Sequence, residues 1–254
     1  MSIDPAIVAD PAQRASLRVP THLGVIMDGN GRWATARGKR RTEGHIEGVK
    51  SLRTMVELCI TYGVKYLTVF SFSSENWTRP REEVAFIFNL LRRFVASDLQ
   101  RLIRNNVKVR IIGTRAGLEP SLVRLIDDVE AKTAANTGLV LVVAFNYGAK
   151  AELVEATRRI ALEVAAGRLA AEDIDETTIE ASLYTAGLPD PDVILRTSGE
   201  QRISNFLLWQ AAYAEFVFVD EHWPDFNEAS FLRVLDMFAQ RDRRFGGIRA
   251  AHLE

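Results

Sequence analysis

Short apolar runs alternate with longer amphipathic stretches along most of the 254-residue chain. This alternation constrains the fold more than any other feature, because strands separated by helices form βαβ crossovers and a mostly parallel sheet. The strand candidates are His22–Met27, Tyr66–Ser71, Val107–Ile112, Leu139–Phe145, Asp192–Leu195 and Glu215–Val219. The predicted helices lie near 43–62, 81–104, 120–136, 149–166, 176–185, 202–212 and 228–240.

The run Leu139–Phe145 is apolar throughout, with no polar residue at alternate positions. This pattern is typical of a strand in a parallel sheet that helices cover on both faces. The sequence contains no internal repeat, low-complexity segment or linker. We therefore predict a single α/β domain over residues 21–254, with a mostly parallel sheet of about six strands flanked by helices. Residues 1–20 are predicted to form a flexible lead-in.

The overall composition excludes several classes of protein. The chain has 32 Lys and Arg residues against 33 Asp and Glu residues, so net charge provides no case for nucleic-acid binding. The single cysteine, Cys59, excludes a disulfide framework and a cysteine-rich zinc site, and it is typical of a reducing cytoplasm. No apolar run approaches the length of a membrane-spanning helix, and the N-terminus lacks the basic region of a secretory signal.

The first polar segment follows the first strand candidate and reads Asp28-Gly29-Asn30-Gly31-Arg32-Trp33. Two glycines permit a tight turn, and the backbone N–H groups of the next turn or helix suit a phosphate. Residues 32–41 contain five basic residues and no acid. Such a run by itself is typical of a solvated basic surface. Its position after a glycine-rich strand end favours an anion site, to which His45 could add a donor.

Two other interpretations of this segment are weaker. Residues 29–34 formally match the dinucleotide-binding fingerprint, but the next strand ends near 71–73, too late to supply the ribose-binding acid. A strand that ends in Asp-Gly-Asn also resembles phosphatases with a nucleophilic aspartate, yet Asn30 stands where their second aspartate is needed. The sequence has no GxxxxGK[ST] loop, so nucleotide hydrolysis has no support.

Polar residues also follow later strands. Residues 73–81 are rich in hydroxyl, amide and guanidinium groups and precede a helix, as a mobile lid would. Arg196, Arg202 and Ser204 follow the fifth strand and predict a second anion site. Asp28 and Glu215 are oxygen donors suited to Mg²⁺, although either alone is more typical of an ordinary polar residue at a strand end.

The helix predicted over 81–104 has more apolar residues than a single stripe requires. It is either a core helix or a helix with one face on an apolar channel or a subunit contact. Two anion sites, two acids and this apolar helix together predict two phosphorylated, partly apolar substrates.

Six segments in order along the chain resemble the characteristic blocks of the cis-prenyltransferases, over roughly residues 20 to 249. These segments are residues 22–33, 37–45, 72–77, 196–200, 202–210 and 243–247. The resemblance, strongest to the undecaprenyl diphosphate synthase type, implies a homodimer. It also implies repeated Mg²⁺-dependent condensation of isopentenyl diphosphate onto an allylic diphosphate such as farnesyl diphosphate. The implied product is a long-chain polyprenyl diphosphate, in particular the undecaprenyl diphosphate used as a cell-wall lipid carrier.

The resemblance also implies roles for individual residues. Asp28 would organise Mg²⁺ and assist departure of the diphosphate, and Glu215 would join the metal site. Asn76 stands where the family takes the proton from the isopentenyl unit, although an amide is a poor base and the leaving diphosphate is an alternative acceptor. The allylic diphosphate would be held by Gly29, Asn30, Gly31, Arg32, Arg41 and His45, with Trp33 packing nearby. Isopentenyl diphosphate would be held by Arg196, Arg202, Ile203 and Ser204, and further substrate contacts would come from Ser73, Ser74, Glu75, Trp77 and Arg79.

The same resemblance places a hydrophobic tunnel between the sheet and the helix over 81–104, with Ser71 and Leu139 as wall residues. The tail at Arg243–Gly246 would reach a neighbouring subunit's active site, and Gln201 replaces a histidine that some relatives place beside the metal. The implied location is the cytoplasm, with transient contact at the inner membrane face for product release. A short-chain cis-prenyl diphosphate synthase and a non-catalytic partner subunit remain alternatives, although the latter would have lost the phosphate-binding blocks.

Overall fold

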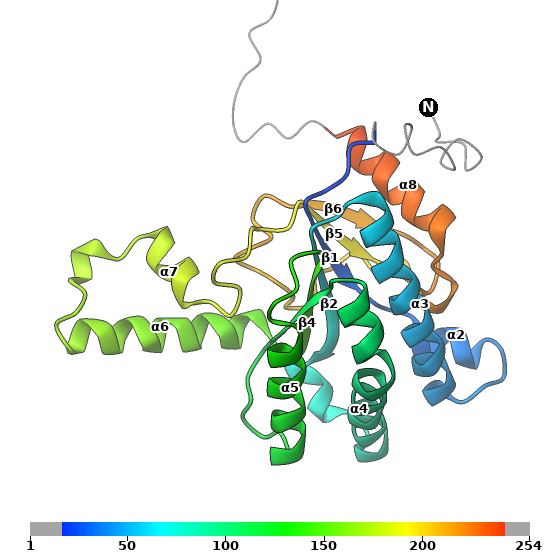
Figure 1. The fold of residues 1–254 in the computed structure, drawn as a ribbon, viewed down its shortest axis with the longest axis horizontal. Coiled ribbons are helices and arrows are strands. Elements are labelled where there is room, and N and C mark those ends of the chain that lie inside the picture. The colour runs from blue at the N-terminus through cyan, green and yellow to red at the C-terminus, as the bar shows by residue number, and fades with distance from the viewer. Residues whose placement is uncertain (1–16, 242–254) are drawn as a thin grey trace, which may run out of the picture.

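The computed structural model describes residues 17–241, so most of the predicted lead-in and the predicted tail at Arg243–Gly246 lie outside the described residues. Within them, the predicted α/β architecture is confirmed (Figure 1). Six strands form one parallel sheet in the order β3-β4-β2-β1-β5-β6. The strands are β1 (His22–Ile26), β2 (Tyr66–Ser73), β3 (Lys108–Ile112), β4 (Val140–Tyr147), β5 (Val193–Arg196) and β6 (Glu215–Phe218).

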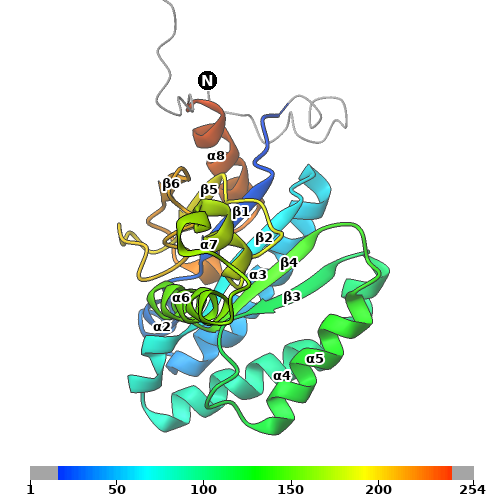
Figure 2. The same cartoon turned by 90° about the vertical axis from the view of Figure 1, so that its left-hand side faces the viewer.

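Helices cover the sheet and connect its strands. The α-helices are α2 (Asn30–Thr35), α3 (Arg41–Tyr62), α4 (Arg81–Arg104), α5 (Pro120–Thr133), α6 (Ala149–Ala165), α7 (Glu176–Ser182) and α8 (Glu228–Ala239). Short 3₁₀ helices occupy Ser74–Thr78 (η2), Ala171–Asp173 (η3) and Trp223–Asp225 (η4). Helices α8, α3, α4 and α5 contact one another in that order and form one layer, whereas α6 and α7 extend away from the sheet as an arm (Figures 1 and 2).

The predicted helix over 202–212 is wrong. The segment is a series of turns, because Ser204, Asn205 and Leu207 have φ angles of 49°, 64° and 48°. These left-handed conformations interrupt any continuous right-handed helix. The turns bring Phe206 and Leu207 fully into the apolar core on one side of the sheet. The short helix α2, which directly follows the first strand, was not among the predicted helices.

Strands β2 and β4 each carry one extra residue near their carboxyl ends. Phe70 pairs with Ala144, Phe72 with Phe145 and Ser73 with Tyr147. Ser71 in β2 and Asn146 in β4 are therefore left without a direct partner, and Asn146 has a φ of 51°. Bulges of this kind re-aim side chains and are common next to functional sites. The two bulges compensate each other, so both strands leave the sheet in register.

Because all six strands are parallel, their carboxyl ends meet at one edge of the sheet, where ligands of open α/β sheets bind. Helix α2, η2 and the loop after β5 all start at this edge. Within residues 17–241, none of the helices is both long enough and apolar enough to cross a membrane.

Candidate active site

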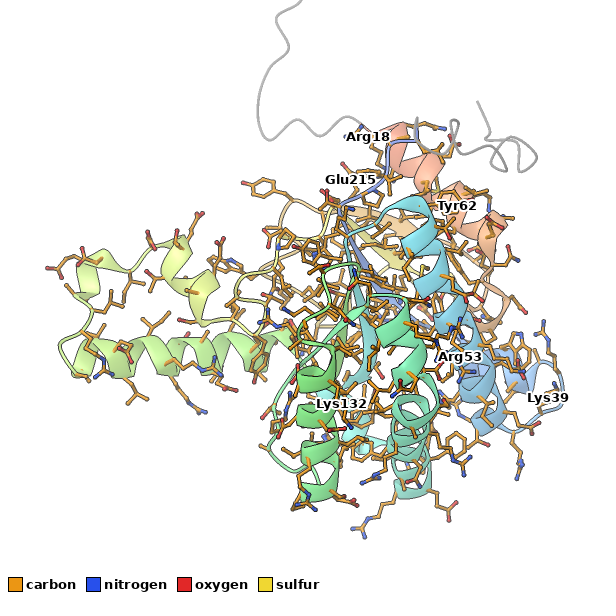
Figure 3. The ribbon with its side chains drawn as sticks, in the orientation of Figure 1. Arg18, Lys39, Arg53, Tyr62, Lys132 and Glu215 are labelled. Atoms are coloured by element: carbon orange, nitrogen blue, oxygen red, sulfur yellow. The ribbon has the colours of Figure 1, made fainter. Side chains whose placement is uncertain are left out.

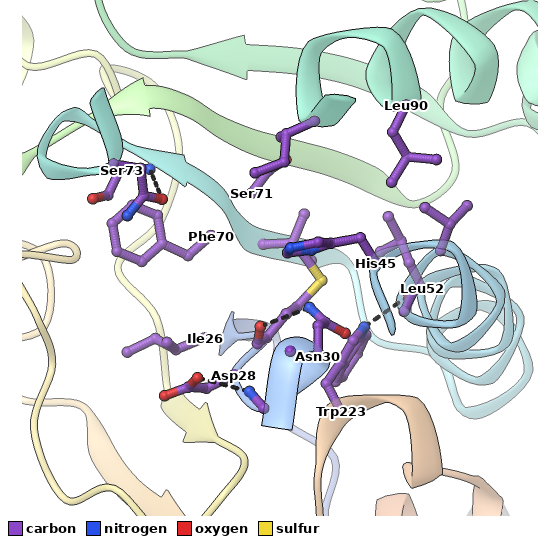
Figure 4. Close-up of a pocket in the computed structure, with 18 of the residues that line it drawn as sticks. Ile26, Asp28, Asn30, His45, Leu52, Phe70, Ser71, Ser73, Leu90 and Trp223 are labelled. Atoms are coloured by element: carbon purple, nitrogen blue, oxygen red, sulfur yellow. Dashed lines mark hydrogen bonds between the residues drawn. The ribbon is translucent and has the colours of Figure 1, made fainter. Parts of the chain in front are cut away.

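A cavity of about 410 Å³ opens at the carboxyl edge of the sheet (Figure 4). Its mouth is polar and its interior, between the sheet and helices α3 and α4, is apolar. The mouth is lined by Asp28, Gly29, Asn30, Gly31, Arg32, Arg41, His45, Ser73, Asn76, Arg79, Arg196 and Ser204. The interior is lined by Val49, Leu52, Val69, Ser71, Ile87, Leu90, Leu91, Phe94 and Val143, among others.

Asp28 follows β1 and sits between two arginines at the mouth. Its Oδ2 accepts a hydrogen bond from Arg196 Nη2 at 2.8 Å, and Arg32 Nη2 lies 3.1 Å from its Oδ1. The Gly29 N–H also donates to Oδ1, at 2.7 Å. Burial would raise the pKa of Asp28, but the Arg196 hydrogen bond, the Gly29 N–H and the charge of Arg32 outweigh it and hold that pKa below its ordinary value. The carboxyl group is therefore ionised at neutral pH.

Glycines shape the turn after Asp28. Gly29 has a φ of 96°, and a side chain there would meet Ser198 Oγ and His222 Nδ1, each at 2.7 Å from the added Cβ. A Cβ on Gly31 would meet the guanidinium of Arg41, at 2.7 Å from Cζ. The left-handed φ favours glycine at position 29, and the lack of a side chain on Gly31 lets the Arg41 guanidinium lie against the turn.

Helix α3 packs directly against the α2 turn through two further glycines. A Cβ on Gly44 would lie 1.9 Å from the carbonyl oxygen of Asn30, and one on Gly48 would lie 2.3 Å from Asn30 Oδ1. That Oδ1 atom is buried and has no hydrogen-bond partner. Trp223, the first residue of η4, also contacts this part of α3: its Nε1 donates to the carbonyl of Gly48 at 2.8 Å (Figure 4).

Arg196, the last residue of β5, is 4% exposed, and its side chain lines the mouth. Besides Asp28, its guanidinium donates to Ser204 Oγ at 2.8 Å and to the Arg202 carbonyl. Its Nε is buried and has no partner. A buried donor without a partner carries a desolvation cost, so this side chain retains capacity for an additional acceptor.

Glu83, which the sequence did not single out, contacts three cationic or ionisable side chains of the mouth without itself lining the cavity. Its Oε1 lies 3.0 Å from Arg79 Nη1 and 3.4 Å from His45 Nε2, and its Oε2 lies 3.6 Å from Arg41 Nε. Burial would raise the pKa of Glu83, but these three neighbours hold it below its ordinary value. Burial also lowers the pKa of His45. Only the i,i+4 spacing of Arg79 and Glu83 hints at this cluster in the sequence, because Arg41 and His45 come from another helix.

Residues 73–79 form an ordered hydrogen-bonded loop rather than an open connection. The Ser73 N–H donates to Asn76 Oδ1 at 3.2 Å, which aims the Asn76 amide at the mouth. Ser73 Oγ and Asn205 Nδ2 donate to the two oxygens of Glu75, at 2.8 and 2.7 Å. Glu75 thereby joins this loop to the turns after β5, which carry the second predicted anion site.

Several predicted site residues lie near the cavity without lining it. Trp33 is buried against Asp225, and Trp77 donates from Nε1 to Asn146 Oδ1 at 2.8 Å. The Arg202 side chain is exposed and pairs with Glu200. The others outside the lining are Ser74, Glu75, Ile203 and the exposed Gln201. Leu139, predicted to form a wall, is buried in the core and is absent from the lining, whereas Ser71 is present.

Glu215 does not join Asp28. It begins β6 and is level with Val193 and Leu23, at the amino end of the strands. Asp28 lies five residues after Leu23, just beyond the end of β1 and roughly 16 Å away at the rise of a parallel strand. Glu215 instead forms an ion pair with Arg241 at 2.9 Å. Figure 3 shows Glu215 near Arg18 at the top of the view, away from Lys39, which follows α2. The expectation that both acids bind one metal is therefore wrong within a single chain, because the strand polarity separates them.

The donor set at the mouth suits a metal that arrives with its substrate. Among the described residues, no group of three or more His, Cys, Asp or Glu side chains could hold a metal ion. Among the residues that line the cavity, Asp28 alone carries a carboxylate, and its two oxygens accept from Gly29 and Arg196. Mg²⁺ typically takes one or two carboxylates together with substrate phosphates and waters, so Asp28 fits a Mg²⁺–diphosphate complex rather than a protein cage.

Comparison with known proteins identifies the family. Residues 26–246 match the family model described as "Putative undecaprenyl diphosphate synthase". The chain belongs to the undecaprenyl diphosphate synthase family. An isoprenyl transferase of Rhizobium meliloti (strain 1021) is 52% identical over 230 residues, which are 91% of this chain and 93% of the relative. The chain is thus a prenyltransferase of the cis-prenyltransferase type, as its sequence blocks predict.

Two further relatives are similar along most of their length. A ditrans,polycis-undecaprenyl-diphosphate synthase ((2E,6E)-farnesyl-diphosphate specific) of Aliivibrio fischeri is 48% identical over 228 residues, 90% of this chain and 89% of that protein. The crystal structure of lavandulyl diphosphate synthase from Lavandula x intermedia in complex with dimethylallyl diphosphate superposes with a TM-score of 0.87. It is 37% identical and covers 89% of this chain and 98% of that chain. The structural similarity confirms the fold of this prenyltransferase.

Proposed function

We propose that this prenyltransferase condenses isopentenyl diphosphate repeatedly onto farnesyl diphosphate and makes undecaprenyl diphosphate. The observation that carries the proposal is one cavity with a cationic mouth around Asp28 and an apolar interior between α3 and α4. Such a cavity suits a molecule with a diphosphate at one end and a hydrocarbon at the other. The farnesyl-diphosphate-specific relative from Aliivibrio fischeri supports the choice of primer.

The allylic diphosphate would lie on the α2 turn. Backbone N–H groups of residues 30–32, in the first turn of α2, and the guanidiniums of Arg32 and Arg41 would surround this position, with His45 at its side. When the allylic C–O bond breaks, negative charge grows on the departing diphosphate. Donors already fixed in place stabilise that charge without reorganisation.

Isopentenyl diphosphate would bind to Arg196 and Ser204, opposite the 73–79 loop. Its double bond attacks the allylic carbon, a new C–C bond forms, and one proton leaves the neighbouring carbon. Asn76 lines the mouth here, but its Oδ1 already accepts the Ser73 N–H. The departing diphosphate is therefore the better proton acceptor, and Asn76 orients the isopentenyl unit.

Mg²⁺ bound with the diphosphate would neutralise its charge, and Asp28 is the residue that would hold it. In this arrangement Arg196 keeps Asp28 ionised and oriented, so one side chain serves both the metal-binding carboxylate and the second diphosphate. The growing hydrocarbon would extend from the mouth past Ser71 towards Phe94. We also propose that the enzyme acts as a homodimer in the cytoplasm, with transient contact at the inner membrane face for release of its lipid product.

The test is an incubation of the purified chain with farnesyl diphosphate, labelled isopentenyl diphosphate and Mg²⁺, followed by chromatography of the products by chain length. We expect a 55-carbon product, and no product when Mg²⁺ is chelated. A product that stops after one or two condensations would identify a short-chain synthase instead. No incorporation of label under any condition would identify a non-catalytic partner subunit.

A further inference from the structure

Helices α3 and α4 form opposite walls of the cavity and run from its mouth to the other edge of the sheet (Figure 1). Higher residue numbers on either helix therefore lie deeper. After Arg41 at the mouth, the lining residues are His45, Gly48, Val49 and Leu52 on α3 and Ile87, Leu90, Leu91 and Phe94 on α4. The apolar lining ends at Leu52 and Phe94.

Directly beyond that end, a charged pair joins the two helices. Arg53 follows Leu52 on α3, and Asp98 lies one turn after Phe94 on α4. Arg53 Nε donates to Asp98 Oδ1 at 2.8 Å and Nη2 donates to Oδ2 at 2.6 Å, a two-pronged contact. Ser97 Oγ also donates to Oδ2, at 2.6 Å. Asp98 is 4% exposed, so the carboxylate is shielded from water.

Asp98 is buried, whereas the Arg53 side chain is 34% exposed. Burying the carboxylate has a desolvation cost that offsets part of its attraction to Arg53, and well-packed apolar side chains would also hold α3 and α4 together. What the pair does supply is geometry, because a guanidinium and a carboxylate meet at a defined distance and orientation. The pair thus fixes the spacing of the two helices at the deep end of the cavity.

The helices have a second polar contact at the mouth, where Glu83 on α4 meets Arg41 and His45 on α3. Asp98 lies fifteen residues after Glu83, about 22 Å along the helix axis. Between these contacts, within the described part of the chain, no hydrogen bond or ion pair joins residues 46–52 to residues 84–96. Apolar side chains alone separate the helices there, and apolar contacts can slide or part without leaving a polar group unpaired.

We propose that the Arg53–Asp98 pair limits product length: the cavity widens between the two polar contacts as the hydrocarbon grows, and growth stops where this pair holds α3 and α4 together. The inference rests on the proposed function, since it concerns the length of that function's product. Arg53 and Asp98 are positioning residues, because neither lines the cavity nor touches the diphosphate sites.

The test compares Asp98→Asn and Asp98→Ala with the parental enzyme, using farnesyl diphosphate and an excess of labelled isopentenyl diphosphate. Asp98→Asn removes the charge but keeps the side-chain volume and one acceptor for Arg53. It therefore separates loss of the ion pair from loss of the fold. Both variants are expected to move the main product to a longer chain, Asp98→Ala further than Asp98→Asn. The rate of the first condensation, measured in a single turnover, should stay within a factor of about two, as for a distant independent site.

Glu57→Gln is the matched control. Glu57 and Arg101 also join α3 to α4, but this pair lies deeper and Glu57 is more than half exposed. Its loss should leave product length unchanged. Parental product lengths in both Asp98 variants, with a lowered melting temperature, would show a structural role only and overturn the inference. Absence of product in the parental enzyme would instead refute the proposed function.

Discussion

The mouth and the interior of the cavity are built by opposite means. At the mouth, nearly every side chain has a charged or hydrogen-bonded partner, and the backbone takes left-handed conformations at Gly29, Ser198 and Ser204. The interior consists of ordinary strand and helix residues in apolar contact. Fixed polar groups are what charge stabilisation requires, whereas a growing hydrocarbon needs walls that adapt. The proposed function therefore assigns rate and substrate affinity to the mouth and product length to the interior.

The largest effect is expected for Asp28→Ala. It removes the carboxylate that would hold Mg²⁺ and the partner of Arg196, and loss of one such group costs on the order of 10²–10³ in turnover rate. Turnover with saturating substrates measures the change, and circular dichroism checks that the fold persists. The residual product should keep its parental length. A variant that retains most of its activity would remove Asp28 from the mechanism.

Arg196→Ala tests the second diphosphate site at the mouth. A hydrogen bond to a charged group contributes about 1.5–3 kcal/mol, so KM for isopentenyl diphosphate should rise roughly 10- to 100-fold. KM for farnesyl diphosphate should change much less. Steady-state kinetics with each substrate varied in turn measure both constants. An unchanged KM for isopentenyl diphosphate would count against this assignment.

Ser71→Leu tests the interior and should have the smallest effect on rate. The larger side chain fills part of the cavity beside β2, so products should become shorter while the first condensation proceeds at close to the parental rate. Chromatography of products by chain length measures the shift. Unchanged product lengths would mean that Ser71 does not limit the interior, and a large fall in turnover would mean that the mouth and the interior are not separable.

The sequence predicts the sheet well because buried parallel strands are marked by continuous apolar runs, as at Leu139–Phe145. It also predicts which residues follow the carboxyl ends of the strands, and this places Asp28, Arg196 and Ser204 together. Contacts between helices are harder to predict. Glu83 on α4 contacts Arg41 and His45 on α3. Nothing in the linear sequence indicates which carboxylates will pack against another helix.

The predictions for residues 202–212 and for Glu215 are wrong for specific physical reasons. The helix over 202–212 has a helical apolar spacing, but three left-handed residues break it into turns that support Arg196. The metal role predicted for Glu215 rests on its carboxylate and on the family resemblance, yet residues that begin a strand and residues that follow one lie at opposite edges of a parallel sheet.

Gly44 and Gly48 let the backbone of α3 pack directly on Asn30, Gly44 against its carbonyl oxygen and Gly48 against its side-chain Oδ1. The Gly44 contact joins backbone to backbone, so no change of rotamer can adjust it. The same helix supplies Val49 and Leu52 to the cavity interior. On the proposed function, these two glycines fix the position of the diphosphate-binding turn relative to the cavity wall on α3. The diphosphate anchor and the wall along which the hydrocarbon is measured belong to one rigid body, so each added unit is counted from the same origin.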